Sequence, residues 1–360
     1  MRVLLLSRYA RLGASSRLRS YQYLSYLKAA GIEMTVAPLF GDDYVRGLYN
    51  GNISWLAVLK AYFARLRFVF RARQFDLVWL EKEMLPWWPG WIELGLLPKN
   101  IPLVVDYDDA IFHRYDHHRL WPVRKLLGKK IDALMRRANI VIAGNEYLAG
   151  RARQAGAQRV ELLPTVVDEN RYAVNAIENA LPVTIGWIGQ PSTAKYLNQL
   201  VPVLKKMIAR HSVRVVAIGA KPAQFQQLPI PIEVKPWAEE SEAADIAQFD
   251  IGVMPLPDKF WERGKCGYKL IQYMACGKPV VASPVGANSV IVRHGLNGFL
   301  AESETEWYEA LDILCKDASL RKQMGNAGRI IMEQNYSLQI TAPQLARLLR
   351  LAADEQIRSY

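Results

Sequence analysis

Cysteine and long apolar runs are both scarce in this sequence. Its three cysteines, Cys266, Cys276 and Cys315, are odd in number and far apart, so they indicate neither a disulfide framework nor a zinc site. No window offers the roughly 18 uncharged apolar residues that a transmembrane helix needs, and the N-terminal apolar run is too short for a signal peptide. We therefore expect a cytoplasmic protein whose only membrane contact, if it has one, is at the inner face of the cell membrane.

Acidic residues are also in short supply. The chain has 34 Asp and Glu against 46 Lys and Arg, which gives a net charge of +12 and an isoelectric point of about 9.5. Such a balance favours anionic partners, namely nucleic acid, anionic lipid or phosphorylated small molecules. Because no nucleic-acid recognition motif accompanies the charge, we do not expect a nucleic-acid partner. The apolar fraction of 51% is typical of a globular protein, and 360 residues are enough for two domains.

Short apolar runs alternate with helical patterns in both halves of the chain. In the first half the runs cover residues 2–6, 32–37, 75–80, 102–105, 140–144 and 160–163. In the second half they cover residues 183–188, 213–218, 232–234, 250–254 and 279–282. This alternation predicts an α/β protein with two parallel sheets, whose strand ends would line a common cleft. The expected divisions are an N-terminal domain 1–170, a linker 171–182, a second domain 183–336, and a C-terminal helix 337–360 that can return to the first domain.

A basic loop of small residues follows the first predicted strand. In open parallel sheets, ligands bind at the C-terminal ends of the strands. The loop lacks the three spaced glycines of a dinucleotide-binding fingerprint. The candidates for contact with an acceptor or a phosphate are Gly13, Ser15, Ser16 and Arg17. A plain connection between strand and helix is the alternative.

Three carboxylates, Asp106, Asp108 and Asp109, come directly after the predicted strand 102–105. Carboxylates so close together are unfavourable unless a positive or protic group approaches them. The cluster fits one catalytic carboxylate with two helpers, and it also fits a metal site. The structural alternatives are an N-terminal helix cap and a solvated acidic turn.

Three tryptophans, Trp87, Trp88 and Trp91, stand among prolines in the segment 84–91. Amphipathic rings with basic neighbours suit a lipid interface. Together with nearby arginines, these tryptophans are therefore candidates for contact with a membrane surface. The alternative is a hydrophobic corner packed on the core of the first domain.

The stretch 258–288 combines glycines and lysines at a predicted helix start. It indicates an irregular loop followed by a helix that opens near Cys266. The first N–H groups of a helix lack intrahelical acceptors and carry partial positive charge, so phosphate is the expected ligand. Close approach and full charge would come from Gly264, Gly267, Lys265 and Lys269. Ordinary solvated lysines are the alternative.

The sequence resembles retaining glycosyltransferases of family 4, which have the GT-B architecture of two Rossmann-like domains facing across a cleft. The resemblance rests on the runs FDIGVMPLP at 249–257, KLIQYMACGKPVVAS at 269–283 and HGLNGFL at 294–300. These C-terminal motifs are specific, whereas the Gly13 loop and the turn 164–168 are weaker matches. The resemblance covers nearly the whole chain and implies a nucleotide-sugar donor.

One departure from the family motif concerns the expected donor site. The family usually places two glutamates on this helix, and alignment on MACGKP puts Gly264 and Gln272 at those positions. Gln272 can still hydrogen-bond a ribose hydroxyl, whereas Gly264 offers no side chain to a donor sugar. Glu262 or Asp258 from the preceding loop is the candidate replacement. The sequence looks like a subgroup with K-C-x-x-K-L-x-Q-Y-M in place of the paired glutamates.

The resemblance implies a nucleotide diphosphate sugar, UDP- or GDP-linked, whose diphosphate lies on the N–H groups near residues 266–268. Lysines and a helix end can stabilise the departing β-phosphate, so neither a metal nor a cofactor is required. Gln272 would bind the ribose, and the surroundings of Trp237 the base. The donor-binding residues that the resemblance implies are Gly189, Trp237, Glu262, Gly264, Lys265, Cys266, Gly267, Tyr268, Lys269 and Gln272.

The resemblance places the acceptor on the first domain. Alignment on the family pattern P-V-V-x-x-x-H puts Asp108 near the reacting centre, with Asp106 and Asp109 as alternatives. The carboxylate would accept a proton from the acceptor hydroxyl or stabilise positive charge on the sugar. The implied function is hexosyl transfer with retention to a glycan or lipid-linked acceptor, in bacterial lipopolysaccharide or cell-surface polysaccharide synthesis. An epimerase or a phosphorylase of the same architecture is the alternative.

Overall fold

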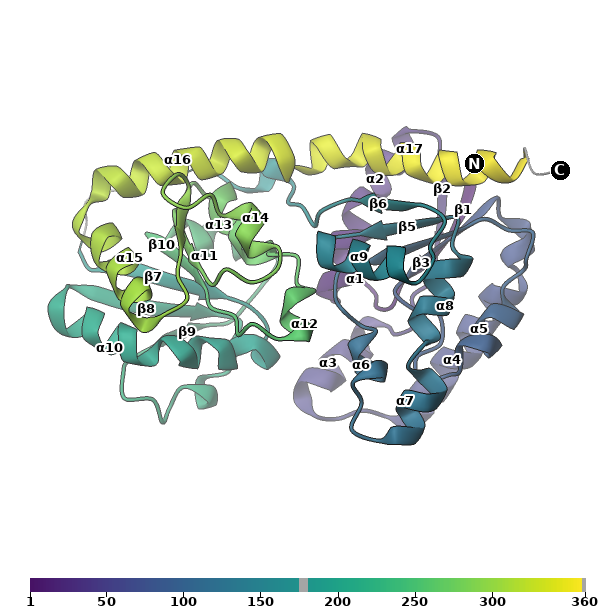
Figure 1. Cartoon of the computed structure of the whole chain (residues 1–360), viewed down its shortest axis with the longest axis horizontal. Coiled ribbons are helices and arrows are strands. Elements are labelled where there is room, and N and C mark those ends of the chain that lie inside the picture. Colours follow the sequence, from purple (N-terminus) through teal and green to yellow (C-terminus); the bar gives the residue numbers. More distant parts are fainter. Residues whose placement is uncertain (175–180, 358–360) are drawn as a thin grey trace. The chain divides into compact units, whose positions relative to one another are not determined.

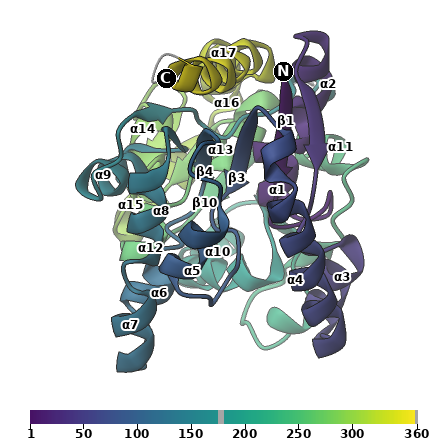
Figure 2. The same ribbon diagram turned by 90° about the vertical axis from the view of Figure 1, so that its right-hand side faces the viewer.

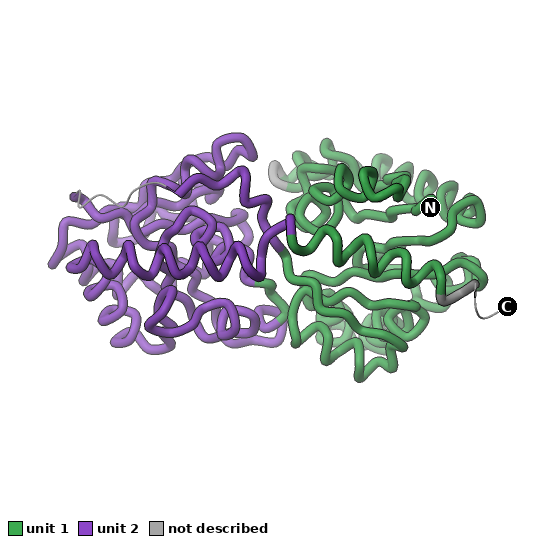
Figure 3. Tube along the Cα trace, turned by 90° about the horizontal axis from the view of Figure 1, so that it is seen from above, with its two compact units in different colours: residues 1–165, 264–266, 340–360 green, residues 166–263, 267–339 purple. Residues whose placement is uncertain are grey.

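The computed structural model describes residues 1–174 and 181–357, and its chain forms two compact units (Figure 3). Unit 1 consists of residues 1–165, residues 264–266 and the C-terminal segment that begins at residue 340. Unit 2 consists of residues 166–263 and 267–339. Each unit has its own sheet and its own buried apolar side chains.

Unit 1 is built on six parallel strands in the order β2-β1-β3-β4-β5-β6 (Figure 1). Their bounds are β1 Arg2–Leu6, β2 Glu33–Val36, β3 Leu77–Glu81, β4 Leu103–Tyr107, β5 Ile140–Ala143 and β6 Val160–Leu162. The central strands β3, β4 and β5 are buried throughout, as expected for apolar runs in a parallel sheet covered on both faces. The strand order reverses between β1 and β3, which is where open α/β sheets bind ligands.

Helices surround this sheet in unit 1. They are α1 Ala14–Arg19, α2 Leu24–Ala29, α3 Asp42–Asn50, α4 Trp55–Phe70, α5 Gly90–Leu96, α6 His113–Asp116, α7 Trp121–Leu127, α8 Lys130–Arg137 and α9 Glu146–Gln154. The last helix of the chain, α17 Leu338–Ile357, also joins unit 1 from residue 340 onward. There the hydroxyl of Thr341 lies 3.0 Å from that of Tyr23, and Arg350 donates to the carbonyl of Ala30.

Unit 2 contains a second sheet of six parallel strands, in the order β12-β11-β10-β7-β8-β9. Their bounds are β7 Val183–Ile188, β8 Val213–Ile218, β9 Glu233–Lys235, β10 Ile251–Met254, β11 Val280–Ala282 and β12 Gly298–Leu300. The order reverses between β7 and β10, so unit 2 has its own position for a ligand. Every apolar run predicted as a strand overlaps a strand of the structure, and β12 is an addition.

The helices of unit 2 are α10 Val201–Arg210, α11 Glu242–Ala247, α12 Phe260–Arg263, α13 Tyr268–Ala275, α14 Asn288–Ile291, α15 Glu304–Lys316 and α16 Ala318–Asn335. A 3-10 helix over Pro191–Leu200 precedes α10. The middle of the expected linker, residues 175–180, lies outside the described residues. Among the helices that the structure describes, none combines the length and the apolar character needed to cross a membrane.

Candidate functional site

In unit 1, charged side chains gather where β3 and β4 end, beside the loop that follows β1. Lys82 follows β3 directly, and its Nζ lies 2.8 Å from Asp108 Oδ1 and 2.9 Å from Ser15 Oγ. Asp109 Oδ2 lies 3.9 Å from the same nitrogen. Because β1 and β3 flank the reversal in strand order, this Lys82 cluster occupies the expected ligand position of the sheet. The structure thus groups three predicted residues around a lysine that the sequence analysis missed.

Lys82 combines an unusual backbone with a buried side chain. Its φ of 63° lies in the left-handed region, which residues other than glycine rarely adopt. Burial disfavours the ammonium ion, but Asp108 and Asp109 outweigh burial and raise the pKa of Lys82, so the side chain stays charged. Residues with such strained backbone conformations cluster at functional sites. The sequence signal was the charged run from Glu81 to Glu83, directly after a buried strand.

The two carboxylates beside Lys82 differ in their readiness to hold a proton. Burial opposes the ionisation of Asp108, but the charge of Lys82 prevails and lowers the pKa of Asp108. Burial, supported by the charge of Asp108, raises the pKa of Asp109 against the influence of Lys265 and Lys82. Lys265 Nζ lies 3.8 Å from Asp109 Oδ1. Neighbouring carboxylates with divergent pKa values can take different roles in one reaction, one staying ionised and the other exchanging a proton.

The two arginines of α1 are buried, and one of them binds Asp106. Arg19 holds both carboxylate oxygens of Asp106, at 2.8 and 3.0 Å, and donates to the carbonyl of Leu163 at 2.7 Å. This two-point ion pair ties α1 to β4 and is almost completely buried. Arg17 is 6% exposed and donates to the carbonyl of Arg11. The structure therefore favours a structural role for Asp106, in contrast to Asp108 and Asp109.

Two further residues of the predicted loop shape the path of the chain before α1. Ser16 is fully buried, and its hydroxyl donates to Glu81 Oε2 at 2.6 Å and accepts from the backbone N–H of Tyr9 at 3.0 Å. Gly13 precedes α1, and a Cβ at this position would lie 2.3 Å from Tyr9 Cβ. Only glycine fits so close an approach. Ser16 and Gly13 thus position the first turn of α1, which carries Ser15.

Residues 264–266 belong to unit 1, where Asn145 holds them. Asn145 Nδ2 donates to the carbonyls of Gly264 at 3.0 Å and Lys265 at 3.1 Å. The thiol of Cys266 is buried in the unit 1 core and donates to the carbonyl of Asp108 at 3.2 Å. Burial raises the pKa of Cys266 to about 12, so this thiol remains protonated. The loop is therefore fixed beside the Lys82 cluster.

The packing of Gly264 explains the departure from the family motif. A Cβ on Gly264 would lie 2.5 Å from Ala110 Cβ and 2.8 Å from Ala110 N. Such short separations would displace the backbone of a close-packed interior. No side chain, glutamate included, fits at this position without rearrangement.

Helix α13 begins at Tyr268, two residues after the expected opening near Cys266. The reason is Gly267, which caps the helix with a left-handed φ of 67°. Tyr268 and Lys269 lie half-buried in the first turn, where N–H groups lack intrahelical acceptors and the helix dipole is positive. This part of unit 2 therefore has the electrostatic character of an anion site.

Predicted donor residues meet where β7 and β8 end. A Cβ on Gly189 would lie 2.7 Å from the Trp187 ring and 2.8 Å from Lys269 Cε. Gly219 has a φ of 81°, and a Cβ there would lie 2.3 Å from the Gly189 carbonyl oxygen and 3.2 Å from Trp237 Cβ. Gly189, Lys269 and Trp237 thus lie together near the ends of β7 and β8 in unit 2. Gly219 adds a second glycine at which the neighbouring backbone leaves no room for a side chain.

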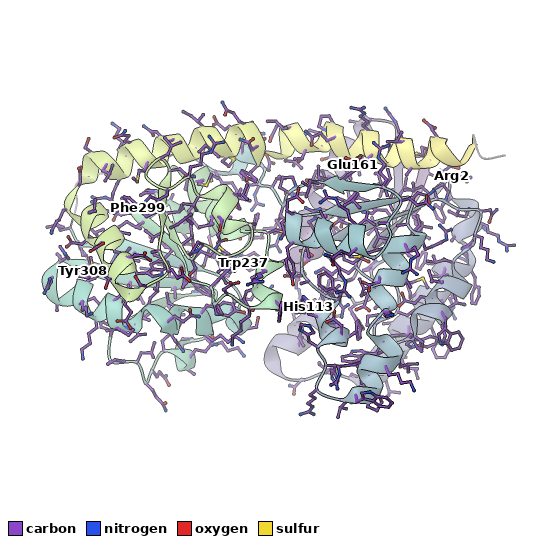
Figure 4. The ribbon with its side chains drawn as sticks, in the orientation of Figure 1. Arg2, His113, Glu161, Trp237, Phe299 and Tyr308 are labelled. Carbon is purple, nitrogen blue, oxygen red and sulfur yellow. The ribbon has the colours of Figure 1, made fainter. Side chains whose placement is uncertain are left out.

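Trp237, labelled in Figure 4, is also linked to Gln272 by a chain of hydrogen bonds within unit 2. Trp237 Nε1 donates to Glu242 Oε2 at 2.6 Å, and the Tyr172 hydroxyl donates to Glu242 Oε1 at 2.7 Å. Gln272 Nε2 lies 3.4 Å from the same hydroxyl and is nearly completely buried. Tyr172 and Glu242 were not predicted from the sequence, because they lie far from the glycosyltransferase-like motif in the chain.

The two acids considered as replacements for the missing glutamate are engaged elsewhere in unit 2. Glu262 is buried on α12 and accepts a hydrogen bond from the Tyr196 hydroxyl. Asp258 is exposed, and its two oxygens accept from Arg263 at 2.6 and 2.8 Å. Both carboxylates therefore already have hydrogen-bonding partners within unit 2.

One group of side chains, in α6 and at the residue directly after it, has the composition of a metal site. His113, Asp116 and His117 offer ligand atoms within 4.8 Å of one another, and Figure 4 labels His113. His113 already contacts Asp116 at 2.9 Å and the Tyr147 hydroxyl at 2.7 Å, and Arg151 lies 3.1 Å from Asp116. A fixed guanidinium on the only carboxylate of this group competes with a divalent cation. The three aspartates at the end of β4 are likewise paired with Arg19 or lie close to Lys82.

The three candidate tryptophans of unit 1 differ in exposure. Trp88 packs partly buried against the unit 1 core and stacks on Tyr62, with ring centres 6.2 Å apart. Trp87 is 50% exposed and Trp91 is 72% exposed. Trp88 therefore forms the hydrophobic corner, whereas Trp87 and Trp91 present their rings to the surface.

Both halves of the chain match models of glycosyltransferase families. Residues 20–171 match "Glycosyltransferase Family 4", and residues 182–317 match "Glycosyl transferases group 1". Two D-inositol 3-phosphate glycosyltransferases are similar to parts of the chain. That of Pseudarthrobacter chlorophenolicus is 32% identical over 127 residues, and that of Arthrobacter sp. is 30% identical over 113 residues. These matches span 35% and 31% of this chain but 29% and 25% of those relatives.

Several solved structures share the fold over nearly the whole chain. Anabaena Alr3699/HepE in complex with UDP and glucose is 19% identical with a TM-score of 0.70, over 97% of this chain and 99% of that one. Sucrose-phosphate synthase from Thermosynechococcus elongatus is 15% identical with a TM-score of 0.73, over 98% of each chain. WaaG, a glycosyltransferase involved in lipopolysaccharide biosynthesis, is 14% identical with a TM-score of 0.70, over 97% of this chain and 99% of that one. Together with the two six-stranded parallel sheets, these similarities establish a GT-B fold.

Proposed function

We propose that this glycosyltransferase, whose halves match the family 4 and group 1 models, transfers a hexosyl group with retention of configuration. The donor is a nucleotide diphosphate sugar, and the acceptor offers a hydroxyl group. The observation that carries the proposal is the Lys82 cluster, which places two carboxylates of divergent pKa at the strand reversal of unit 1.

The two carboxylates would divide the chemistry between them. Asp109 is 30% exposed and has a raised pKa, which suits acceptance of the proton from the acceptor hydroxyl. Asp108 is kept ionised by Lys82, which suits stabilisation of positive charge on the sugar as its bond to the β-phosphate breaks. The acceptor oxygen then bonds to the anomeric carbon, and the nucleoside diphosphate leaves.

Unit 2 would hold the donor. Gly189 and Gly219 let Lys269 and Trp237 pack close to the backbone, where the Trp237 ring would offer a surface for the base. Lys269 and the first N–H groups of α13 would neutralise the diphosphate, so that the leaving group is stabilised without a metal ion or a cofactor. UDP is a suitable first test, because UDP is bound in the Anabaena structure that shares this fold.

The acceptor would be a glycan or a lipid-linked glycan of a bacterial cell surface, with lipopolysaccharide as the first candidate. The net charge of +12 and the exposed rings of Trp87 and Trp91 support an enzyme that works at the inner face of a membrane. WaaG, of similar fold, is involved in lipopolysaccharide biosynthesis. The alternative is another reaction of a nucleotide sugar, an epimerisation or a phosphorolysis, which the identity of the products distinguishes.

Thermal unfolding with UDP, GDP, ADP and CMP tests the donor assignment. A ligand that binds the folded protein raises the midpoint, so we expect one nucleoside diphosphate to raise it. If duplex DNA raised the midpoint and no nucleotide did, the proposal would fail.

Asp108→Ala and Asp109→Asn test the assignment of the chemistry. Each should retain the nucleotide-dependent shift and lose transfer by about 100-fold or more, since general acid–base and electrostatic contributions are of this size. Asp43→Ala is the matched control, because the Asp43 side chain is 99% exposed. Full turnover in both site variants would move the chemistry elsewhere.

A further inference from the structure

Helix α4 exposes an apolar face that the proposed transfer reaction does not use. Its inner side is packed: Arg65 and Val69 are buried, and the Tyr62 hydroxyl donates to the carbonyl of Pro86 at 2.8 Å. On the outer side, five large side chains are more than half exposed. These are Trp55 at 83%, Leu56 at 72%, Leu59 at 54%, Phe63 at 59% and Phe70 at 68%. We call these five residues the α4 face.

The spacing of these residues places them side by side on the helix. At the α-helical rotation per residue, the five side chains fall within an arc of about 100°. Figure 2 shows α4 on the near side of unit 1. An amphipathic helix of a globular protein normally turns its polar side to water, whereas α4 is apolar on both its packed side and its outer side. A contiguous apolar surface of this kind marks an interaction site.

The charges around the α4 face indicate what covers it. Lys60 and Arg67 are exposed and adjoin the apolar arc. Counted as rotation about the helix axis from Trp55, they lie at about 140° and 120°, directly beyond the arc of about 100°. Arg71 and Arg73 follow the helix and are exposed as well. No acidic residue occurs between Trp55 and Asp76. The expected partner is therefore anionic as well as apolar.

We propose that α4 is an interfacial helix that seats unit 1 on an anionic lipid surface. Tryptophan, phenylalanine and leucine enter the boundary between headgroups and acyl chains, while lysine and arginine bind the anionic headgroups. A protein partner would need a groove that matches the convex surface of α4, whereas a bilayer does not. A bilayer can therefore bind a helix whose apolar and basic residues share one side. A lipid-binding surface on α4 rests on the proposed function, because that function supplies the reason for the enzyme to bind a membrane. Lipid binding itself can be measured without any transfer reaction.

Sedimentation of the full chain with vesicles tests this assignment. We expect binding to vesicles of phosphatidylcholine mixed with phosphatidylglycerol, and much weaker binding to phosphatidylcholine alone or at high salt. The double variant Leu56→Ser/Phe63→Ser should bind at least about tenfold more weakly, since both side chains lose apolar burial in the lipid. Lys60→Gln/Arg67→Gln should also lose about tenfold or more, since each basic residue near an anionic membrane contributes about fivefold.

Matched controls separate this surface from general effects. Ile313→Ser/Ile330→Ser removes exposed apolar side chains from α15 and α16, and Lys205→Gln/Lys206→Gln removes exposed charges from α10. Both controls should bind vesicles like the parent. The UDP-dependent thermal shift should be the same in all variants, so a failure of the donor assignment is distinguishable from a failure here.

Two results would overturn the proposal. One is equal vesicle binding by the parent and both α4 variants, or no binding by any of them. The other is self-association of the parent in analytical ultracentrifugation without lipid that Leu56→Ser/Phe63→Ser abolishes, because a second copy of the chain would then cover the α4 face.

Discussion

The strand ends of the two units carry different chemistry on the same kind of sheet. In unit 1 the residues that follow β3 and β4 include Lys82, Asp108 and Asp109, which form a compact charged cluster. In unit 2 the residues that follow β7 and β8 are Gly189 and Gly219, whose backbone packs directly against neighbouring residues such as Lys269 and Trp237. One topology thus supplies a charged cluster in one unit and closely packed glycines in the other, since function resides in the site rather than in the fold.

The two units also differ in how their buried charged side chains are paired. Close to the unit 1 cluster, Glu83 binds Lys130 at 2.8 Å and Arg8 at 2.7 Å, and Glu93 binds Lys130 at 2.8 Å, all in buried positions. In unit 2, buried charged side chains are instead held by uncharged groups: Glu242 by Trp237 and Tyr172, Glu262 by Tyr196, and Arg321 by the carbonyls of Leu314 and Cys315. Buried charges are tolerated only when they are paired, so unit 1 should be the more sensitive unit to loss of a single charge.

Lys82→Met is the most severe test of this difference. The change removes the cation that keeps Asp108 ionised, so we expect transfer to fall by about 1,000-fold while UDP still shifts the unfolding midpoint. Lys82→Arg should recover part of the activity, because it keeps the charge. The exposed Lys99 provides the control Lys99→Met. Unimpaired transfer by folded Lys82→Met would remove the cluster from the mechanism.

Lys269→Ala tests the corresponding role of unit 2. We expect the affinity for UDP to fall by about 10- to 100-fold, because a charge-assisted hydrogen bond contributes about 1.5–3 kcal/mol. Isothermal titration measures this loss, with Lys205→Ala on α10 as a control of equal charge change. An unchanged affinity would show that the diphosphate binds away from the start of α13.

Gly264→Ala tests whether packing, rather than ligand contact, selects glycine in the loop held by Asn145. The added Cβ would meet Ala110, so we expect the free energy of unfolding to fall by about 1–3 kcal/mol. Gly150→Ala in α9 is the matched control, because nothing lies within 4 Å of its added Cβ. There alanine should raise stability by about 0.5–1 kcal/mol. Denaturant unfolding of both variants would decide, and equal stability changes would contradict the packing explanation.

The smallest expected effect is the pH dependence that Glu93 gives to the free energy of unfolding, and the direction of this dependence can be checked. Burial, only partly opposed by Lys130, raises the pKa of Glu93 to about 7, so the folded protein binds a proton that the unfolded chain has released. This contribution to stability is fully present below the pKa of an unfolded glutamate and is lost as pH rises through about 7. The stability of the parent relative to Glu93→Gln should therefore fall by about 1–2 kcal/mol between pH 6 and pH 8. A difference that stays constant across this range would contradict the raised pKa.

Much of the fold followed from local pattern, whereas the candidate site followed only in part. Buried strands such as β4 are uninterrupted apolar runs, and their ends locate the loops that bind ligands in parallel sheets. Asp108 and Asp109 were found in this way, but their partner Lys82 was not, because 26 residues of chain separate it from Asp108. Tyr172 and Glu242 were missed for the same reason: hydrogen bonds between distant segments leave no mark on local sequence.

The sequence by itself determined two α/β halves, a basic protein and a family motif with glycine in place of a glutamate. Those properties depend on short-range periodicity, composition and spacing, which are readable along the chain. The tertiary structure decided which aspartate is paired with arginine, which lies beside Lys82, and why Gly264 admits no side chain. Protonation and steric fit depend on the charges and atoms that folding brings within a few ångströms, and these come from distant parts of the chain.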